Sequence, residues 1–193
     1  MSPHLLVAVS SHGLGHLGQV APVVNALRAR RPELRLTFRT ALTGERLAQR
    51  VEGPFERQVC ADDFGMRNTS ALDVDVEASA AAYRELHRHW PDKVVAVAEE
   101  IAAARPDLIL ADAPYLTCAA GAHAGVPVVA LCSLNWADIY WHYCATRPEA
   151  PTIHAQMLEA YDAAKAFLQP APSMPMADLS NTLPIGPVAT RAV

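Results

Sequence analysis

The sequence predicts an α/β fold: a doubly wound, Rossmann-like parallel sheet with helices on both faces, in three layers. Short apolar segments alternate with longer segments of helical periodicity along most of the 193 residues. The apolar segments are nearly continuous, as in strands that are covered on both faces. A glycine-rich turn follows the first apolar segment and opens the first helical one. Together these observations favour a parallel sheet wrapped by helices.

Composition limits the classes of protein to which this chain can belong. Half of it is hydrophobic (51%) and 19% is charged, which fits one globular domain or one half of a two-domain protein. A net charge of −4 without a basic run gives no electrostatic reason to expect nucleic acid. We find no signal peptide and no segment of about 20 apolar residues, and so expect a cytoplasmic protein without a membrane span. The four cysteines lie far apart and are expected to be reduced.

The first half of the chain alternates strands and helices before an irregular segment at 61–75. Apolar residues recur at helical spacing from Leu17 to Leu27, where Pro22 is tolerable only near the first turn. The expected strands are Leu5–Ser10, Leu34–Arg39 and Phe55–Cys60, and a short helix is expected at Thr43–Val51.

The second half continues the alternation and ends in a proline-rich segment. A long alanine-rich helix should run from about Val76 to Ala104, with a break near Pro91. The segment from 169 onward is expected to leave the domain as a tether, so we predict one domain at 1–185 and the start of an interdomain linker at 186–193. The other expected elements are strands at Leu108–Ala111 and Val126–Cys132, helices at Tyr115–Ala124 and Ile153–Leu168, and a last short strand around Leu183–Ile185.

The glycine turn resembles a dinucleotide-binding loop, but only in part. Its pattern is Gly13-x-Gly15-x-x-Gly18, yet Ser10, Ser11 and His12 lie between the apolar run and the first glycine. No acidic residue ends the second strand to bind a ribose; Arg39 stands there and could instead suit a 2′-phosphate. An NADP-dependent oxidoreductase therefore stays open as an alternative.

The same turn presents a histidine that is a candidate general base. His16 lies at the start of the first helix, where the helix dipole should keep the imidazole uncharged. Asp112 ends the fourth strand, which is next to the first in the sheet order 3-2-1-4-5. We therefore expect the two side chains to meet and to face an open crevice. The alternatives are that Asp112 caps the helix from Tyr115 and that His16 is an ordinary loop histidine.

Three stretches of the sequence carry a resemblance to a known family. GLGHLGQVAPVVNALRAR, PDLILADAPYLTCAAGAHAGVPVVAL and the closing PIGPVA resemble, in this order, the N-terminal half of GT-B-fold glycosyltransferases. These are nucleotide-sugar-dependent enzymes that glycosylate small molecules. Many members carry a proline three or four residues after the histidine, whereas here the first proline is Pro22.

The resemblance implies that this chain binds the acceptor, and that a C-terminal domain absent from it binds the nucleotide-sugar donor. His16 would deprotonate an acceptor hydroxyl and Asp112 would orient His16, giving inversion at the anomeric carbon without a metal or resident cofactor. The chain alone should then be nearly inactive. A nucleotide-sugar hydrolase or epimerase of the same fold and a non-catalytic binding module remain as alternatives.

Further residues are candidates for contacts with substrate. Gly13 and Gly15 keep the loop thin, and His12 is placed to touch a diphosphate or a sugar hydroxyl. After the fifth strand, Asn135, Trp136 and Tyr140 belong to an aromatic-rich segment that either lines an acceptor pocket or packs in the core. The run His87-Arg88-His89-Trp90 leaves two interpretations open. Either one of its histidines faces the crevice, or the run is a solvent-exposed helix face with one buried aromatic residue.

Overall fold

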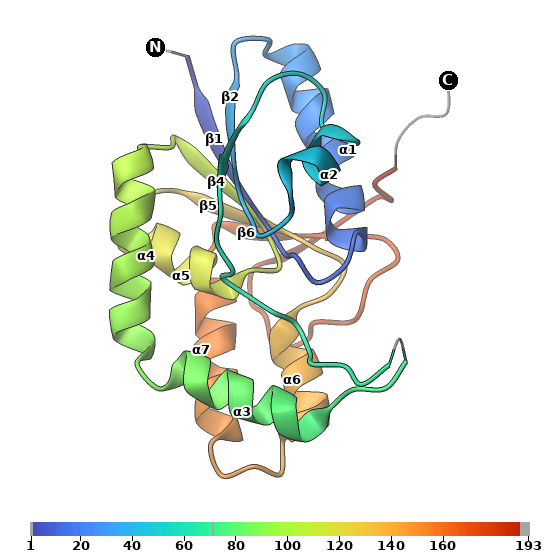
Figure 1. Cartoon of the computed structure of the whole chain (residues 1–193), viewed down its shortest axis with the longest axis vertical. Helices are drawn as coiled ribbons and strands as arrows, with labels where there is room; N and C mark the ends of the chain where they lie inside the picture. The colour runs from blue at the N-terminus through green and yellow to red at the C-terminus, as the bar shows by residue number, and fades with distance from the viewer. Residues whose placement is uncertain (1, 71, 190–193) are drawn as a thin grey trace.

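A computed structural model describes residues 2–70 and 72–189 as a seven-stranded parallel sheet with helices on both faces (Figure 1). The strand order is β3-β2-β1-β4-β5-β6-β7, and every neighbouring pair is parallel. The predicted Rossmann-like fold class and the predicted order 3-2-1-4-5 are confirmed, and two further strands extend the sheet. Residues 190–193 of the predicted linker lie outside the described residues.

The elements alternate as predicted over most of the chain. The strands are β1 (His4–Val9), β2 (Arg35–Arg39), β3 (Glu56–Gln58), β4 (Leu108–Asp112), β5 (Val128–Leu131), β6 (Ala166–Pro170) and β7 (Thr182–Ile185). The helices are α1 (Gly15–Arg30), α2 (Gly44–Ala48), α3 (Val76–His87), α4 (Trp90–Ala104), α5 (Tyr115–His123), α6 (Trp136–Cys144) and α7 (Ala150–Asp162). None of the helices within the described ranges is long and apolar enough to cross a lipid bilayer.

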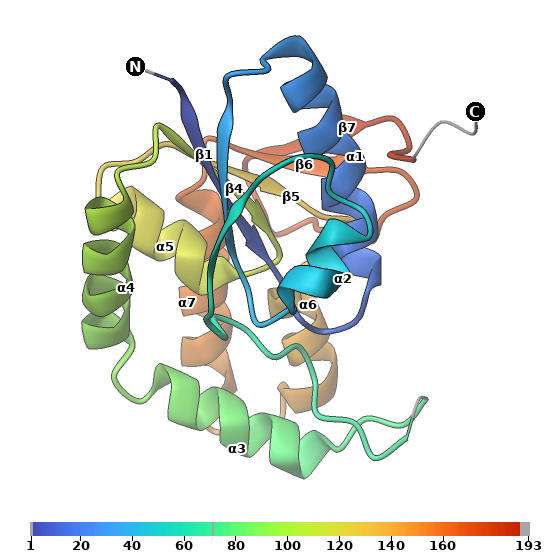
Figure 2. The same ribbon diagram turned by 45° about the horizontal axis from the view of Figure 1, so that its top comes forward.

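The sheet separates two hydrophobic cores. Helices α1 and α2 cover one face, and α4, α5 and α7 cover the other (Figures 1 and 2). Alternate residues of β1 serve the two cores: Leu5 and Val7 pack with α1, whereas Leu6 and Ala8 pack with the larger helical layer. All four side chains are buried, which is why the β1 sequence is continuously apolar. Helix α3 crosses below this layer, next to α6 (Figure 2).

The predicted helix Ile153–Leu168 is wrong at its C-terminal end. Helix α7 stops at Asp162, and Ala166–Pro170 form β6, which pairs with β5 and β7. Pairing with β5 decides the conformation, because it buries Phe167 completely in the core. The predicted tether is wrong over residues 169–181, which stay with the domain, whereas the last short strand predicted around Leu183–Ile185 is confirmed as β7. Pro184 is tolerated there because β7 lies at the sheet edge.

Pro22 occupies a helical position that differs from the one expected, whereas the predicted helix break near Pro91 is confirmed. Helix α1 begins at Gly15, so Pro22 lies in its interior and not in its first turn. The break in the long predicted helix falls at residues 88–89, and Pro91 is in the first turn of α4. Lys93 donates hydrogen bonds of 2.8 Å to the carbonyls of Glu85 and Leu86, which end α3. These bonds hold α3 and α4 at their bend.

His87 lies buried at this bend and does not face a crevice. Its Nδ1 is 2.7 Å from Oε1 of Gln156, and its Nε2 is 2.9 Å from the hydroxyl of Tyr115. The ring stacks on Trp90, with 4.7 Å between ring centroids. Burial lowers the pKa of His87 to about 4, so the ring is neutral at pH 7. The neighbouring His89 is exposed, as expected for a solvated face.

We predict that His87 makes the fold sensitive to acid. The pKa of this ring is about 4 when folded and about 6.5 when unfolded, so the unfolded chain binds more protons between these values. The stability contribution of neutral His87 is complete above pH 6.5 and is lost as the pH falls to 4, by at most about 3 kcal/mol. Urea unfolding of wild type and His87→Gln between pH 7 and pH 4 should show a shallower loss in the variant. His89→Gln is the matched control; equal slopes in wild type and His87→Gln would contradict the prediction.

Candidate active site

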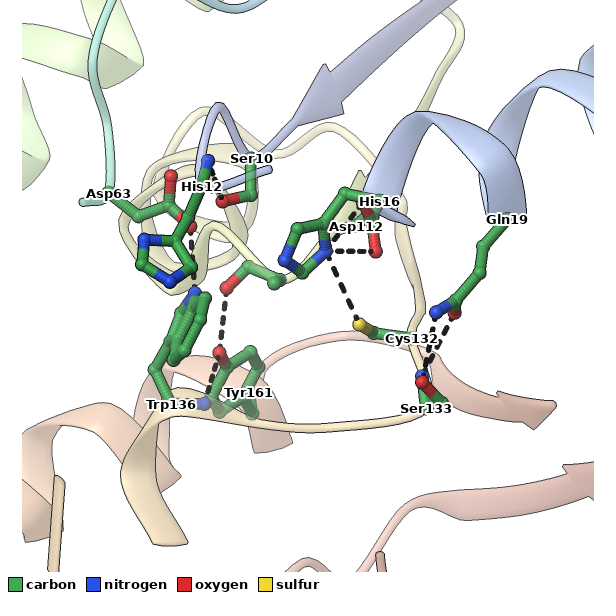
Figure 3. Close-up of polar contacts among 11 residues, drawn as sticks. Ser10, His12, His16, Gln19, Asp63, Asp112, Cys132, Ser133, Trp136 and Tyr161 are labelled. Atoms are coloured by element: carbon green, nitrogen blue, oxygen red, sulfur yellow. Dashed lines mark hydrogen bonds and ion pairs between the residues drawn. The ribbon is translucent and has the colours of Figure 1, made fainter. Parts of the chain in front are cut away.

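The carboxyl ends of β1, β4 and β5 meet at one edge of the sheet and carry a group of polar side chains (Figure 3). A cavity of about 370 Å³ opens beside them. Its walls come from the β1–α1 turn, the 61–75 segment and α6, so the irregular segment helps to shape the pocket. The lining residues are His12, Gly15, His16, Gln19, Met66, Asn68, Leu72, Val74, Leu134, Trp136, Ile139 and Tyr143.

His16 and Asp112 meet at this edge although 96 residues separate them in the sequence. Nδ1 of His16 is 3.2 Å from Oδ1 of Asp112 and 3.1 Å from its Oδ2 (Figure 3). The parallel register sets this contact, because Val9 at the end of β1 pairs with Asp112 at the end of β4. Since a carboxylate only accepts, Nδ1 of His16 is the protonated nitrogen. Its Nε2 then has a free lone pair, and no hydrogen bond to it occurs among residues 2–70 and 72–189.

The two side chains differ in their access to the cavity. His16 is 6% exposed and lines the cavity, whereas Asp112 is 0% exposed and lies behind it. The expectation that both groups face an open crevice is therefore correct for His16 only. Asp112 does not cap α5 either, because the N-cap residue is Pro114 and no side chain caps that helix. The arrangement is that of an imidazole oriented from behind by a buried carboxylate.

The electrostatics of His16 differ from the expectation based on the helix dipole. Burial lowers the pKa of His16, but its hydrogen bond to Asp112 and the charges of Asp112 and Asp63 outweigh burial and raise the pKa above its ordinary value. The expected uncharged state rested on the dipole of α1 alone, and the direction of that shift is wrong. A histidine with a raised pKa is a stronger base than an ordinary one.

The β1–α1 turn, which leads into His16, owes its shape to its glycines. Gly13 adopts φ +91°, a conformation that L side chains rarely take, and this residue turns the chain toward α1. A Cβ atom at Gly13 or Gly15 would meet nothing within 4 Å, so open space borders the turn. The backbone N–H of His12 donates to Oγ of Ser10 at 3.2 Å, which orders the start of the turn.

Asp63 is a functional candidate that the sequence did not reveal. Its Oδ2 accepts a 2.8 Å hydrogen bond from Nε1 of Trp136, and that indole packs edge-on against His12 with 5.2 Å between ring centroids. Burial raises the pKa of Asp63 to about 6, although hydrogen bonds from Ser10 and Trp136 and the charge of His16 oppose the rise. The irregular sequence around 61–75 gave no signal for this contact, because the contact depends on how the segment folds back onto α6.

Two more contacts fix the start of α6 against the sheet. The hydroxyl of Tyr161 donates to the carbonyl of Ala113 at 2.6 Å and accepts from the backbone N–H of Trp136 at 3.2 Å. Gln19 and Ser133 exchange two hydrogen bonds, of 2.9 and 3.1 Å, between α1 and the end of β5 (Figure 3). The floor of the cavity is thus held rigidly next to His16.

The remaining predicted site residues are divided between the cavity and the core. His12, Gly15 and Trp136 line the cavity, and Gly13 lies in the adjoining turn. Asn135 is buried, and its side chain accepts from the backbone of Asp138 and so caps α6. Tyr140 is 0% exposed and packs against Tyr83 at 4.7 Å between ring centroids. Neither residue lines the cavity, so ordinary packing, the alternative for this segment, describes both.

The residue expected to serve a 2′-phosphate is occupied by ion pairs. Arg39 is buried, and its guanidinium donates to both carboxylate oxygens of Asp62, at 2.5 and 3.0 Å. A further bond of 2.7 Å joins Arg39 to Glu100. The guanidinium is therefore already neutralised within the protein, which removes the basis of the dinucleotide alternative.

Comparison with known proteins gives matches of structure only. No family model matches the sequence, and no curated protein does. The calicheamicin glycosyltransferase CalG4 has a TM-score of 0.60 and 17% identity, over 97% of this chain and 53% of its own. A UDP-glucosyltransferase from Polygonum tinctorium that glucosylates indoxyl has a TM-score of 0.58 and 10% identity, over 100% and 54%. Phytolacca americana UGT2, solved with UDP-2-fluoro-glucose and pterostilbene, has a TM-score of 0.57 and 10% identity, over 98% and 55%.

This chain has the fold of one half of a GT-B glycosyltransferase. It spans about half the length of these structures, as the resemblance in the sequence implied. At identities of 10–17% the likeness concerns the fold, and the roles of individual residues in this GT-B half rest on its own geometry.

We predict that Gly65 is essential for the packing of the cavity wall. The residue has φ +62°, and an added Cβ would lie 2.6 Å from Cγ of His12 and 2.8 Å from Cη2 of Trp136. Gly125→Ala is the matched control, because Gly125 has φ +71° and open space around its Cα. Gly65→Ala should lower the free energy of unfolding by at least about 1 kcal/mol more than Gly125→Ala, measured by urea denaturation. Equal losses would show that the loop yields without cost.

Proposed function

We propose that this chain is the acceptor-binding half of an inverting glycosyltransferase, which moves a sugar from a nucleotide-sugar donor to a hydroxyl of a small molecule. The observation that carries the proposal is the His16–Asp112 pair, with a free Nε2 on the side of a cavity. The half-length match to UDP-sugar-dependent enzymes supports the reaction class. The donor would be bound mainly by a second, donor-binding half.

The chemistry follows from the protonation pattern of the pair. Nε2 of His16 accepts the proton of the acceptor hydroxyl, and the resulting imidazolium is stabilised by Asp112, 3.1 Å from Nδ1. The acceptor oxygen forms a bond to the anomeric carbon while the bond from that carbon to the nucleoside diphosphate breaks. Attack from the face opposite the leaving group inverts the anomeric centre. This sequence of steps needs no resident metal or cofactor.

The cavity favours an uncharged acceptor with apolar surface. Most of its lining is apolar or aromatic, and no carboxylate, lysine or arginine is among the residues that line it. Leu72 is 94% exposed at the tip of the 61–75 segment, so it is available for contact with a bound molecule. Asn68 is among the polar groups of the lining that would orient a hydroxylated ligand.

The alternatives have less support than transfer. A nucleotide-sugar hydrolase or epimerase would use the same His16, but the structures from Polygonum tinctorium and of CalG4, which share the fold, are named as a UDP-glucosyltransferase and a glycosyltransferase. A binding module without catalysis would leave the orientation of His16 by a buried carboxylate without a purpose. An oxidoreductase loses its phosphate partner, since Arg39 is paired with Asp62 and Glu100.

We predict that the pair controls turnover in a protein that contains this chain and a donor-binding half. His16→Ala should lower kcat at least about 100-fold with little change in donor KM, because the base acts only in the transition state. Asp112→Asn should lower kcat at least about 10-fold and move the acidic limb of the pH–rate profile to lower pH. The sign follows from the pKa of His16, which Asp112 raises and which must be exceeded for the base to be neutral.

The control for this experiment is His89→Ala, which removes an exposed histidine at the bend between α3 and α4. It should leave kcat and the pH profile unchanged. Turnover that survives His16→Ala would remove His16 from the chemistry. A pH profile that stays in place in Asp112→Asn would reduce Asp112 to a structural residue.

A further inference from the structure

A buried thiol completes a three-residue cluster behind the cavity. Sγ of Cys132, at the end of β5, lies 3.8 Å from Nδ1 of His16 (Figure 3). The nearest atoms of His16, Asp112 and Cys132 all lie within 4.8 Å of one another, and all three residues are buried. Strands β1, β4 and β5 are adjacent in the sheet, so the fold itself brings these side chains together.

One carboxylate oxygen of this cluster is buried without a hydrogen bond of its own. Oδ2 of Asp112 is completely buried and has no hydrogen-bond donor of its own among the described residues, because the single Nδ1–H of His16 is shared with Oδ1. An unpaired buried carboxylate oxygen is costly, and a cation bound there would remove the cost. The oxygen lies 3.1 Å from Nδ1 of His16, the same nitrogen that the thiol approaches.

The spacing of the three atoms is that of ligands around a small ion. In tetrahedral zinc sites the bonds to nitrogen and oxygen are about 2.0–2.2 Å and the bond to sulfur about 2.3 Å. Such bonds place neighbouring ligand atoms roughly 3.3–3.7 Å apart. The separations of 3.1 and 3.8 Å from Nδ1 of His16 are within a few tenths of an ångström of this range.

We propose that His16, Asp112 and Cys132 form a binding site for a thiophilic divalent cation, Zn²⁺ above all, that blocks the base. The thiol selects zinc or cobalt over magnesium and calcium, which prefer oxygen ligands. A second group, Asp138, His154 and Asp178, also has metal-ligand spacing. It contains no thiol and Asp178 is exposed, so it lacks the features on which the proposal rests.

Binding of the ion changes which atoms of the cluster carry protons. The Cys132 thiol loses its proton to solvent when the ion binds, so affinity should increase with pH. The ion replaces the proton on Nδ1 of His16, and the proton of the neutral ring then resides on Nε2. A ring in that state donates from Nε2 and cannot accept a proton there. The inhibition, but not the binding, rests on the proposed function.

The test is a cobalt titration of the chain under reducing conditions. Co²⁺ bound to a thiolate gives a charge-transfer absorption band that carboxylate and imidazole ligands do not give. We expect one equivalent of Co²⁺ to produce this band and Zn²⁺ to abolish it by competition. Cys132→Ser should lose the band, whereas Cys118→Ser, which alters another fully buried cysteine, and Cys60→Ser, which alters a more accessible one, should keep it.

A second variant keeps the thiol and guards against misfolding of the first. His16→Gln should weaken cobalt binding at least about 10-fold, with a far-UV circular dichroism spectrum like that of wild type. Absence of the band in wild type, or its survival in Cys132→Ser, would overturn the site. If the band behaves as expected but Zn²⁺ leaves transfer unaffected in the protein with a donor-binding half, the site stands and the proposed role of His16 fails.

Discussion

The hydrogen bond between His16 and Asp112 is the contact on which the site depends. It exists because β1 and β4 are parallel neighbours in register, so that Val9 pairs with Asp112 and the β1–α1 turn lies above the end of β4. The cavity, the protonation pattern and the metal cluster all use this one placement. Asp112 is fully buried, and its charge is tolerated because the ring of His16 faces it. Removal of either partner therefore leaves the other one buried and uncompensated.

Two carboxylates near His16 have different environments and different consequences. Asp112 lies behind the ring and holds it, whereas Asp63 comes from the 61–75 segment and holds the indole of Trp136. Burial raises the pKa of Asp63 to about 6, so this group exchanges its proton in the same pH range as an ordinary histidine. The packing of Gly65 against His12 and Trp136 shows how tightly this segment closes on the site. The segment thus couples the shape of the cavity to the electrostatics of the base.

Most of the sheet and the key pair could be predicted from the sequence, because both follow from local pattern and from the topology of parallel sheets. In the predicted order, the strand that ends in Asp112 is the direct neighbour of the strand that leads into the turn carrying His16. What failed depended on tertiary pairing: Phe167 becomes a strand residue only because β5 is there to accept it. Tyr140 is also hard to place from the sequence, because an aromatic residue that follows a strand can either line a pocket or pack in the core. In the structure it packs in the core.

The most direct measurement of the central claim is the nitrogen NMR spectrum of the His16 imidazole as a function of pH. Our account predicts a neutral ring that carries its proton on Nδ1, and a pKa above the ordinary histidine value that falls when Asp112 is replaced by Asn. A neutral ring protonated on Nε2, or a pKa that is indifferent to Asp112→Asn, would contradict it.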